Sequence, residues 1–340
     1  MSELIKINLA ETLSALGEKL LNPSQELLQL IDNERQFNAW FTSENVLQAV
    51  QAIGKMLNAK NLEQWLPKNA DTVFTGKKIG LVLAGNIPLV GFHDVLCVLA
   101  SGHFAMIKAS ANDSRLISYI LKQLVLLEPE FGNRYEFTER LAGFDAVMAT
   151  GSNNTSRYFE YYFGKVPNII RKNRNSLAVL SGEESEEDLQ KLGHDIFDYF
   201  GLGCRSISKI LVPKGYDFGQ LFRAIEPFQP IINHHKYNNN YDYNKSIYLV
   251  NQNTHFDNGF LLLKQDEKIA SPLAVVFYDF YADLEEVNLK LNQQKEAIQC
   301  IVSQLQLTEN LQVVSFGESQ HPKLWDYADG VNTMDFLQSI

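Results

Sequence analysis

Cys204 has the most reactive setting among the three cysteines of the chain. It follows Gly201 and Gly203 and precedes Arg205 in the run DYFGLGCRSISKILVP. Glycines let a backbone approach a bound group closely, and nearby positive charge or a helix N-terminus lowers the pKa of a thiol from about 8.5, which enriches the nucleophilic thiolate. We therefore consider Cys204 a candidate nucleophile. On these local features alone, a non-catalytic cysteine is an equal alternative.

The other two cysteines lie among aliphatic residues, Cys97 in DVLCVLA and Cys300 in AIQCIVSQL. A thiol in such a run acts as a small buried hydrophobe, so both are assigned to the core. Three distant cysteines with no CxxC pair favour neither a disulfide framework nor a zinc cluster. His234 and His235 lack a third ligand at a suitable spacing, so we expect a surface loop there and no metal site.

A second candidate is the turn inside LVLAGNIPLVGFHDVLCVLASGHFAMIKAS. This segment predicts a strand, a turn with Gly85, Asn86 and Pro88, a helix, and a strand ending at Lys108. An asparagine at the carboxyl end of a strand points into a cleft. The alternative is a plain tight turn, because all these residue types favour turns.

The elements that position these residues follow from the hydrophobic periodicity. Residues 1–67 predict several helices, since Ile5, Leu9, Leu13, Leu16 and Leu20 recur at helical spacing and Val46, Val50, Ile53 and Leu57 do so again. From Lys77 onward, short apolar runs alternate with helical ones, which predicts a parallel sheet with crossover helices.

A second alternating region begins with a helix over 186–200 and the strand SKILVP. It continues through the predicted strands SIYLVN, GFLLLK and PLAVVFYDF, the helix EEVNLKLNQQKEAIQCIVSQL and the strand LQVVSFG, with a polar loop over 234–245. The resulting domain prediction is a helical segment over 1–70, α/β domains over 71–185 and 186–315, and a C-terminal segment over 316–340. The acidic SGEESEEDLQ is taken as the crossing between lobes, with a solvated helix start as the equal alternative.

The composition is that of a globular protein able to bury a large core, with 340 residues, 45% of them hydrophobic. A net charge of -10 and a pI near 5.3 argue against nucleic acid as a partner. The most apolar stretch, 79–100, is interrupted by Asn86, Pro88, His93 and Asp94, so we expect no membrane span. The N-terminus does not resemble a signal peptide, and a cytoplasmic location is expected.

Taken together, these segments resemble the aldehyde dehydrogenase superfamily. Asn86-Ile87-Pro88 resembles its Asn-x-Pro turn, with the cofactor-binding lysine strand about twenty residues on, at Lys108. The run 149–152 resembles its Thr-Gly-Ser nicotinamide loop, and 201–204 its Gly-Gln-x-Cys nucleophile motif; SPLAVVFYDF and the following helix resemble its Gly-Pro strand and helix. The length and the ending QHPKLWDYADGVNTMDFL are similar to fatty acyl-CoA reductases of the bacterial luminescence type. The implied fold is α/β, aldehyde dehydrogenase-like, with two Rossmann-like lobes after an N-terminal helical segment.

The resemblance also implies roles. Cys204 attacks an acyl thioester, and Asn86, with the backbone N–H of Cys204, donates hydrogen bonds to the oxyanion. Lys108 contacts the adenosine ribose, while Gly151 and Ser152 approach the cofactor. Ser110 lies in Ala-Ser-Ala, where NAD-preferring members carry a glutamate that binds the ribose 2′-hydroxyl, so the expected cofactor is NADPH.

Departures from the family pattern set the expected direction of the reaction. Arg171 stands where hydrolytic members carry a general-base glutamate, which favours discharge of an acyl-enzyme by hydride over hydrolysis. Lys268 and Leu202 also replace family residues that contact the cofactor. Three hypotheses follow: reduction of an acyl-CoA to an aldehyde, oxidation of a free aldehyde with NAD(P), or a non-catalytic acyl-binding module.

Other polar residues have two interpretations each. The cluster Arg171, Lys172 and Arg174 could meet the phosphates of CoA or cofactor, or be a solvated strand edge. The C-terminal residues His321, Trp325 and Asp329 could close over an acyl pocket or pack the last helix. An acyl-transferring protein partner and a homo-oligomer both stay open.

Overall fold

The structure, a computed structural model, describes residues 8–66, 76–307 and 311–340 and divides the chain into two compact units. Unit 1 comprises residues 1–173 and 322–340, and unit 2 comprises residues 174–321. The predicted Ile5 and the predicted boundary between residues 70 and 71 lie outside the described residues. Each unit is described by itself.

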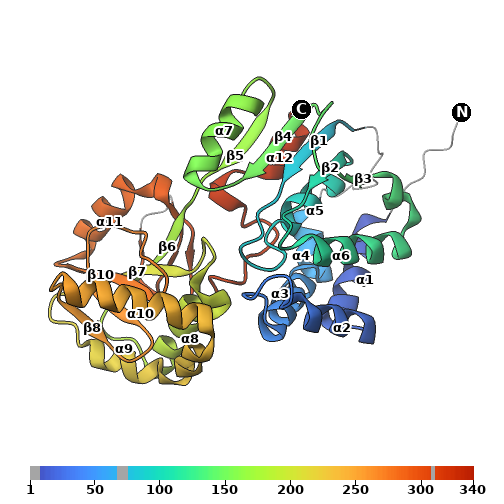
Figure 1. Cartoon of the computed structure of the whole chain (residues 1–340). Coiled ribbons are helices and arrows are strands. Elements are labelled where there is room, and N and C mark those ends of the chain that lie inside the picture. Colours follow the sequence, from blue (N-terminus) through green and yellow to red (C-terminus); the bar gives the residue numbers. More distant parts are fainter. Residues whose placement is uncertain (1–7, 67–75, 308–310) are drawn as a thin grey trace, which may run out of the picture. The chain divides into compact units, whose positions relative to one another are not determined.

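Unit 1 contains a parallel five-stranded sheet in the order β3-β2-β1-β4-β5 (Figure 1). Its strands are β1 (Lys78–Val82), β2 (Phe104–Lys108), β3 (Tyr135–Phe137), β4 (Ala146–Thr150) and β5 (Asn168–Arg171). Helices α5 (Phe92–Ala100), α6 (Ser114–Leu127) and α7 (Asn153–Phe163) connect them, with the 3₁₀ turn η1 (Pro129–Asn133). The alternation of strand and helix patterns from Lys77 onward is confirmed.

The N-terminal helices belong to the same hydrophobic core as this sheet. They are α1 (Leu9–Leu21), α2 (Gln25–Glu34), α3 (Ser43–Met56) and α4 (Ala59–Trp65). Every apolar position of the predicted helical pattern from Leu9 to Leu57 is buried. Ser24, Thr42 and Asn58 cap three of these helices by accepting from backbone N–H groups, which explains where they begin.

Unit 2 contains a seven-stranded sheet in the order β12-β11-β6-β7-β10-β9-β8, parallel except for the pair β8 and β9. Its strands are β6 (Asn175–Val179), β7 (Ile207–Pro213), β8 (His255–Asp257), β9 (Leu262–Gln265), β10 (Val275–Tyr281), β11 (Ile298–Val302) and β12 (Val313–Val314). Its helices are α8 (Glu186–Phe197), α9 (Phe218–Ala224), α10 (His235–Val250) and α11 (Leu284–Gln293), with 3₁₀ turns η2 (Asp198–Gly201), η3 (Glu226–Asn233) and η4 (Lys295–Ala297). This is the predicted fold class, with two parallel-sheet α/β lobes.

Two element predictions in unit 2 are wrong. The expected loop over 234–245 and the expected strand SIYLVN form one helix, α10, whose buried face is Tyr237, Tyr241, Asn244 and Tyr248. Polar and aromatic residues carry that helical period, so an aliphatic pattern does not reveal it. The second half of the predicted helix 285–305 is strand β11, in which all five residues are buried between β6 and β12.

The division of the chain also differs from the predicted boundaries. The first unit ends at Asn173, twelve residues before the predicted end at Ser185, because β6 pairs with β7 and β11 in the second sheet. SGEESEEDLQ follows β6 and starts α8, where Ser185 and Asp188 form a capping box. The predicted C-terminal segment is divided as well, since residues 322–340, with η5 (Ala328–Gly330) and α12 (Thr333–Gln338), belong to unit 1.

Candidate active site

The predicted cofactor residues lie at one edge of the sheet in unit 1. Val82 pairs in register with Lys108 on β2 and with Ala149 on β4. Because the strands are parallel, their carboxyl ends share an edge. The structure therefore brings together at this edge the residues that end or follow these strands: Asn86, Lys108, Ser110, Gly151 and Ser152.

This edge contains the point where the strand order reverses. The chain moves outward from β1 through β2 to β3 and then returns to the other side of β1 with β4 (Figure 1). Ligands of open parallel sheets bind outside the carboxyl ends of the strands at such a switch point. Asn86 follows β1 and Gly151 follows β4, so they come from the two strands that flank it.

Two backbone N–H groups anchor the turn that carries Asn86. Its first residue, Leu83, donates its backbone N–H to the Lys108 carbonyl at 3.1 Å, and Leu89 donates to Asp113 Oδ2 at 2.8 Å. Leu89 adopts a φ of 59°, which is rare for a bulky residue and is maintained here by burial and by Asp113. Asp113 is itself buried, and this desolvation raises its pKa. Asn86 itself is exposed.

Ser110 packs closely against the same turn. A Cβ built on Gly85 would collide with the Ser110 side chain, so only glycine permits this close approach. The Ser110 hydroxyl also accepts from the backbone N–H of Asn112 at 3.3 Å. The structure thus gives Ser110 a packing role, and its contact with a cofactor stays a prediction.

The strand β4 leads directly into the N-terminus of α7. Gly151 donates its N–H to the Arg171 carbonyl at 3.3 Å, and a Cβ on Gly151 would lie 2.9 Å from Phe159. Ser152 is the N-cap of α7 and accepts from the backbone N–H of Thr155 at 3.2 Å. The start of an eleven-residue helix carries unpaired N–H groups and the positive end of the helix dipole, which favour anions.

These features fit a dinucleotide cofactor. The edge offers the reversal of strand order, a glycine where a Cβ would collide on each side of it, and a helix N-terminus for a pyrophosphate. Lys108 ends β2 with its side chain exposed, as a contact to an adenosine ribose requires. A nicotinamide cofactor bound here would supply a hydride.

Arg171 is part of a buried ion pair inside unit 1. Its Nη1 donates to Asp94 Oδ2 on α5, and its Nη2 donates to the Thr333 hydroxyl at 3.2 Å. Burial lowers the pKa of Arg171, but the adjacent Asp94 carboxylate more than offsets this, so the net direction is upward. The phosphate-binding interpretation of the basic cluster is therefore wrong for Arg171, whose charge Asp94 compensates.

The other two members of that cluster have separate partners. Lys172 pairs with Glu160 at 2.8 Å on the surface. Arg174 donates to the Ile298 carbonyl at 3.2 Å and lies 3.6 Å from Glu296 in unit 2. The three residues do not act as one basic patch.

Cys204 lies in unit 2, in the turn between η2 and β7. Tyr199, Phe200 and Gly201 have φ values of 53°, 60° and 75°, so the chain turns sharply through left-handed backbone before it reaches Cys204. Ser206 closes the turn by donating its N–H to the Gly203 carbonyl at 3.1 Å. Cys204 is exposed, whereas Cys97 and Cys300 are fully buried, which confirms their assignment to the core.

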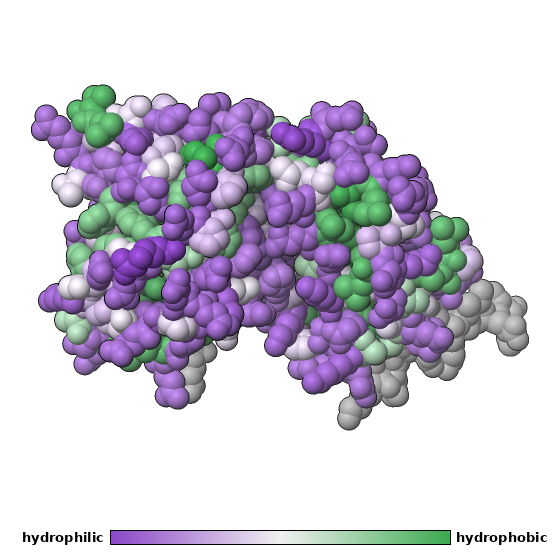
Figure 2. All heavy atoms as spheres, turned by 90° about the horizontal axis from the view of Figure 1, so that it is seen from below, coloured by the Kyte–Doolittle hydropathy of each residue, from purple (hydrophilic) through white to green (hydrophobic). Residues whose placement is uncertain are grey.

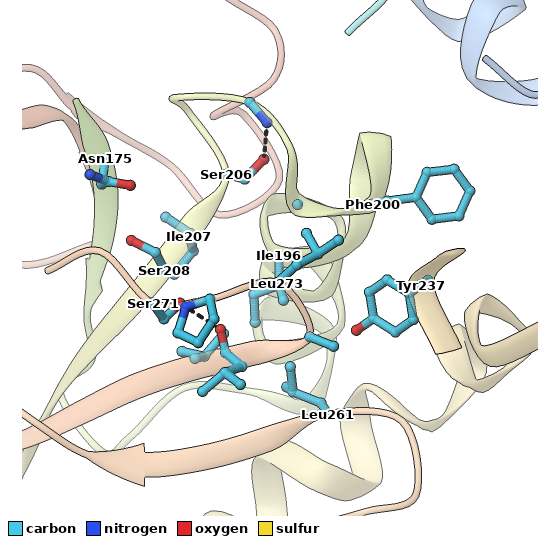
Figure 3. A pocket seen from close by; sticks show the side chains of 16 residues that line it. Asn175, Ile196, Phe200, Ser206, Ile207, Ser208, Tyr237, Leu261, Ser271 and Leu273 are labelled. Atoms are coloured by element: carbon cyan, nitrogen blue, oxygen red, sulfur yellow. Dashed lines mark hydrogen bonds between the residues drawn. The ribbon is translucent and has the colours of Figure 1, made fainter. Parts of the chain in front are cut away.

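A small cavity of about 70 Å³ adjoins this turn within unit 2 (Figure 3). Its walls include Gly201 and Gly203 of the turn, Ile196 of α8, and the stretch 271–276 leading into β10. Ser208 and Ser271 also line it, but their hydroxyls already donate to the Ile269 and Val275 carbonyls at 2.9 and 2.5 Å. The cavity therefore has a mixed lining, in which the polar residues Asn175, Ser206, Ser208 and Ser271 lie beside aliphatic ones.

The C-terminal residues have different environments. His321 ends unit 2 and donates its N–H to the Glu318 carbonyl at 3.1 Å. Trp325 packs against the core of unit 1 beneath Lys323, whose Nζ lies 5.8 Å from the ring centroid. The interpretation as packing is thus favoured for Trp325. His234 and His235 begin α10, stacked on each other with ring centroids 5.2 Å apart.

Among the described residues, no group of three or more histidines, cysteines and carboxylates could hold a metal ion. In the same part of the chain, no helix is long and apolar enough to cross a membrane. The face in Figure 2 is mostly hydrophilic, with hydrophobic residues in small separate patches.

Several solved structures are similar to this chain along most of its length. The aldehyde dehydrogenase KauB from Pseudomonas aeruginosa matches with a TM-score of 0.65 and 12% identity, over 97% of this chain and 83% of that one. An acetylating aldehyde dehydrogenase from Geobacillus thermoglucosidasius matches with a TM-score of 0.62 and 8% identity, over 96% and 89%. The chain has an aldehyde dehydrogenase-like fold.

A third similar structure has a nucleotide bound. The NADP-dependent glyceraldehyde-3-phosphate dehydrogenase from Bacillus halodurans, complexed with NADP, matches with a TM-score of 0.59 and 13% identity, over 89% of this chain and 74% of that one. At these identities the similarity establishes the fold. No protein-family model matches the sequence, and a search among curated proteins finds no relative.

The sequence did not single out the polar residues that surround the Cys204 turn. Ser176 on β6 donates to the Cys204 carbonyl at 3.0 Å, and Gln320 donates to Ser206 Oγ at 3.1 Å. Asp195 on α8 accepts from the N–H groups of Gly317 and Ser319, and burial raises its pKa to about 6. One available signal was the pair of polar residues, Asn175 and Ser176, that begins the otherwise apolar strand β6.

Proposed function

We propose that this protein is an NADPH-dependent acyl-CoA reductase that converts a fatty acyl thioester to an aldehyde through an acyl group on Cys204. The observation that carries the proposal is the environment of Cys204: it is the exposed thiol among three, in a closed turn of the aldehyde dehydrogenase-like fold. An exposed thiol on a rigid turn suits covalent catalysis.

In the proposed reaction, an electron pair of the Cys204 thiolate forms a bond to the thioester carbonyl carbon, and the carbonyl π electrons move to oxygen. The backbone N–H of Cys204 and the side-chain amide of Asn86 donate to that oxyanion. When the carbonyl re-forms, the CoA thiolate leaves and takes a proton from solvent. Hydride delivery to the acyl carbon then gives a second oxyanion, whose collapse releases the aldehyde and the Cys204 thiolate.

Two sequence features support reduction by NADPH. The Ala-Ser-Ala run after Lys108 carries no carboxylate that would repel a 2′-phosphate. Arg171, at the position where the resemblance expects a general base, is a cation held by Asp94 and cannot activate water. Both favour an acyl-enzyme that is discharged by hydride.

The proposal is tested by incubating the protein with palmitoyl-CoA and NADPH. Loss of NADPH absorbance should accompany formation of hexadecanal and CoA in equal amounts. Parallel assays use NADH, and the free aldehyde with NADP with and without CoA. Oxidation of aldehyde that does not depend on CoA, with no reduction of palmitoyl-CoA, would instead identify an ordinary aldehyde dehydrogenase.

Asn86→Ala should slow the acylation step about a hundredfold. Loss of one oxyanion donor typically costs about 3 kcal/mol of transition-state stabilisation. The rate of CoA release in a single turnover measures this step. Asn112→Ala is the control, because Asn112 is also an exposed asparagine of unit 1 but donates only its backbone N–H, to Ser110. Equal rates in the two variants would remove Asn86 from the oxyanion site.

A further inference from the structure

The structure fixes three consecutive peptide groups around Cys204, each through one hydrogen bond. The Leu202–Gly203 peptide donates its N–H to Ser206 Oγ at 3.2 Å, the bond drawn as a dashed line beside Ser206 in Figure 3. The Gly203–Cys204 peptide accepts at its carbonyl from the Ser206 N–H at 3.1 Å. The Cys204–Arg205 peptide accepts at its carbonyl from Ser176 Oγ at 3.0 Å.

These bonds determine where the Cys204 N–H points. In a planar trans peptide, the C=O and N–H directions are opposite. With the Gly203 carbonyl tied to Ser206, the N–H of Cys204 must point away from that bond. The bond from Ser176 to the next carbonyl fixes the other peptide plane of Cys204, so neither plane can rotate without breaking a hydrogen bond.

The hydroxyl of Ser176 has one proton, and its other contacts direct that proton to Cys204. Ser176 Oγ accepts the backbone N–H of Cys300 at 3.2 Å, and the Cys300 sulfur lies 3.1 Å away. Because the Cys204 carbonyl can only accept, the Ser176 hydroxyl donates its proton there, which leaves the Cys300 thiol as the donor to the serine oxygen. With both lone pairs of Ser176 engaged, its proton is left for the Cys204 carbonyl.

Ser206 is anchored in turn by the end of unit 2. Gln320, which is buried, donates to Ser206 Oγ at 3.1 Å. The backbone just before Gln320 is held by Asp195, which accepts from Gly317 and Ser319 at 2.7 and 2.9 Å. The turn is therefore tied to α8, to β6 and, through Cys300, to β11.

We propose that Ser176 and Ser206 are positioning residues that hold the Cys204 N–H in the direction of an oxyanion. The inference rests on the proposed function, because it gives that N–H a task. Preorganised donors lower a barrier only when they already point at the developing charge. Loss of either hydroxyl should therefore impair steps that form an oxyanion and spare steps that do not.

The test compares two reactions of the same sulfur. With p-nitrophenyl acetate, the Cys204 thiolate forms a bond to the carbonyl carbon, negative charge moves to oxygen, and p-nitrophenolate then leaves. With iodoacetamide, the thiolate displaces iodide from a saturated carbon, and no oxyanion forms. Cys204→Ala supplies the background of both reactions.

Ser176→Ala and Ser206→Ala should lower the rate of the acetylation burst at least about tenfold and change the alkylation rate less than about twofold. Ser176→Thr, which keeps the hydroxyl, should restore the burst to within a few-fold of wild type. The matched control is Ser303→Ala, since Ser303 is also buried and donates to a backbone carbonyl of the same sheet, that of Val179, at 2.8 Å. It should leave both rates unchanged.

Equal losses in both reactions, or the same loss in Ser303→Ala, would overturn the inference, because they would indicate general damage to the fold. No loss in Ser176→Ala would overturn it as well. A wild-type protein that is acetylated at Cys204 by the ester but never accepts an acyl group from acyl-CoA would refute the proposed function and not this positioning role. Wild-type protein with no burst above the Cys204→Ala background would refute both.

Discussion

Replacing Cys204 with alanine should lower NADPH consumption with palmitoyl-CoA at least about a thousandfold, to the background of the uncatalysed reaction. Removal of the nucleophile eliminates the covalent intermediate, and no neighbouring group can form the thioester in its place. The measurement is the initial rate of NADPH loss under saturating acyl-CoA. The affinity for acyl-CoA should change little, so the expected decrease is in kcat.

Cys97→Ala is the matched control for this substitution. Cys97 is fully buried on α5, and burial keeps the pKa of its thiol well above the ordinary value, so it cannot serve as a nucleophile at neutral pH. Its loss should leave turnover within a few-fold of wild type. If the Cys204→Ala variant still reduced palmitoyl-CoA at a substantial rate, the acyl group would be reduced directly on CoA, or another residue would carry it.

Asp94→Ala should destabilise unit 1 by about 3 to 5 kcal/mol. Arg171 would then keep its charge in the interior without its salt-bridge partner. The hydrogen bond to the Thr333 hydroxyl and the weaker attraction of the Asp329 carboxylate would stay, but a poorly compensated buried charge is costly. Unfolding in urea can be followed in this unit alone, because Trp40, Trp65 and Trp325 all belong to it. The midpoint of the fluorescence transition should fall accordingly.

The exposed pair Lys172 and Glu160 is the control for the buried one. Their side chains are 56% and 50% exposed, so Glu160→Ala should cost less than about 1 kcal/mol. The double variant Asp94→Leu with Arg171→Met should recover most of the stability lost in Asp94→Ala, since an apolar pair of similar volume often replaces a buried ion pair without loss. A small effect of Asp94→Ala, equal to that of Glu160→Ala, would contradict the account of this ion pair.

The sequence was most informative where short aliphatic runs alternate with helical ones. IGLVLA, FAMIKAS and SKILVP predict strands correctly because parallel strands buried on both faces are almost continuously apolar. It was least informative at α10, whose buried face is built from tyrosines and an asparagine. The five buried residues of β11 were also missed, because a short apolar run after a helix fits either structure.

The boundary between units depends on long-range pairing that a single sequence does not display. RKNRNSLAVL contains the end of β5 and all of β6, yet these adjacent strands belong to different sheets. The acidic run beyond them has the composition of a linker but is a capped helix start. Composition identifies solvated segments, whereas only strand pairing shows which sheet a strand joins.

The candidate residues themselves could be located from sequence, but their support could not. Asn86 and Cys204 stand out by type and by neighbouring glycines. Asp113, Ser176 and Gln320 hold the turns that carry them from 24, 28 and 114 residues away in sequence, measured to the residue each one bonds. Such contacts follow from the folded topology. Arg171 shows that a sequence pattern can also mislead. It belongs to a basic cluster in the sequence, but in the fold it forms a buried ion pair with Asp94.

The central claim is a hydride-dischargeable acyl group on Cys204, and intact-protein mass spectrometry tests it most directly. After exposure to palmitoyl-CoA, the wild-type chain should gain the mass of one palmitoyl group, mapped to the peptide containing Cys204. Addition of NADPH should remove that mass and release hexadecanal, whereas NADP should leave it in place. A palmitoyl group on another residue, or one on Cys204 that NADPH does not remove, would contradict the account.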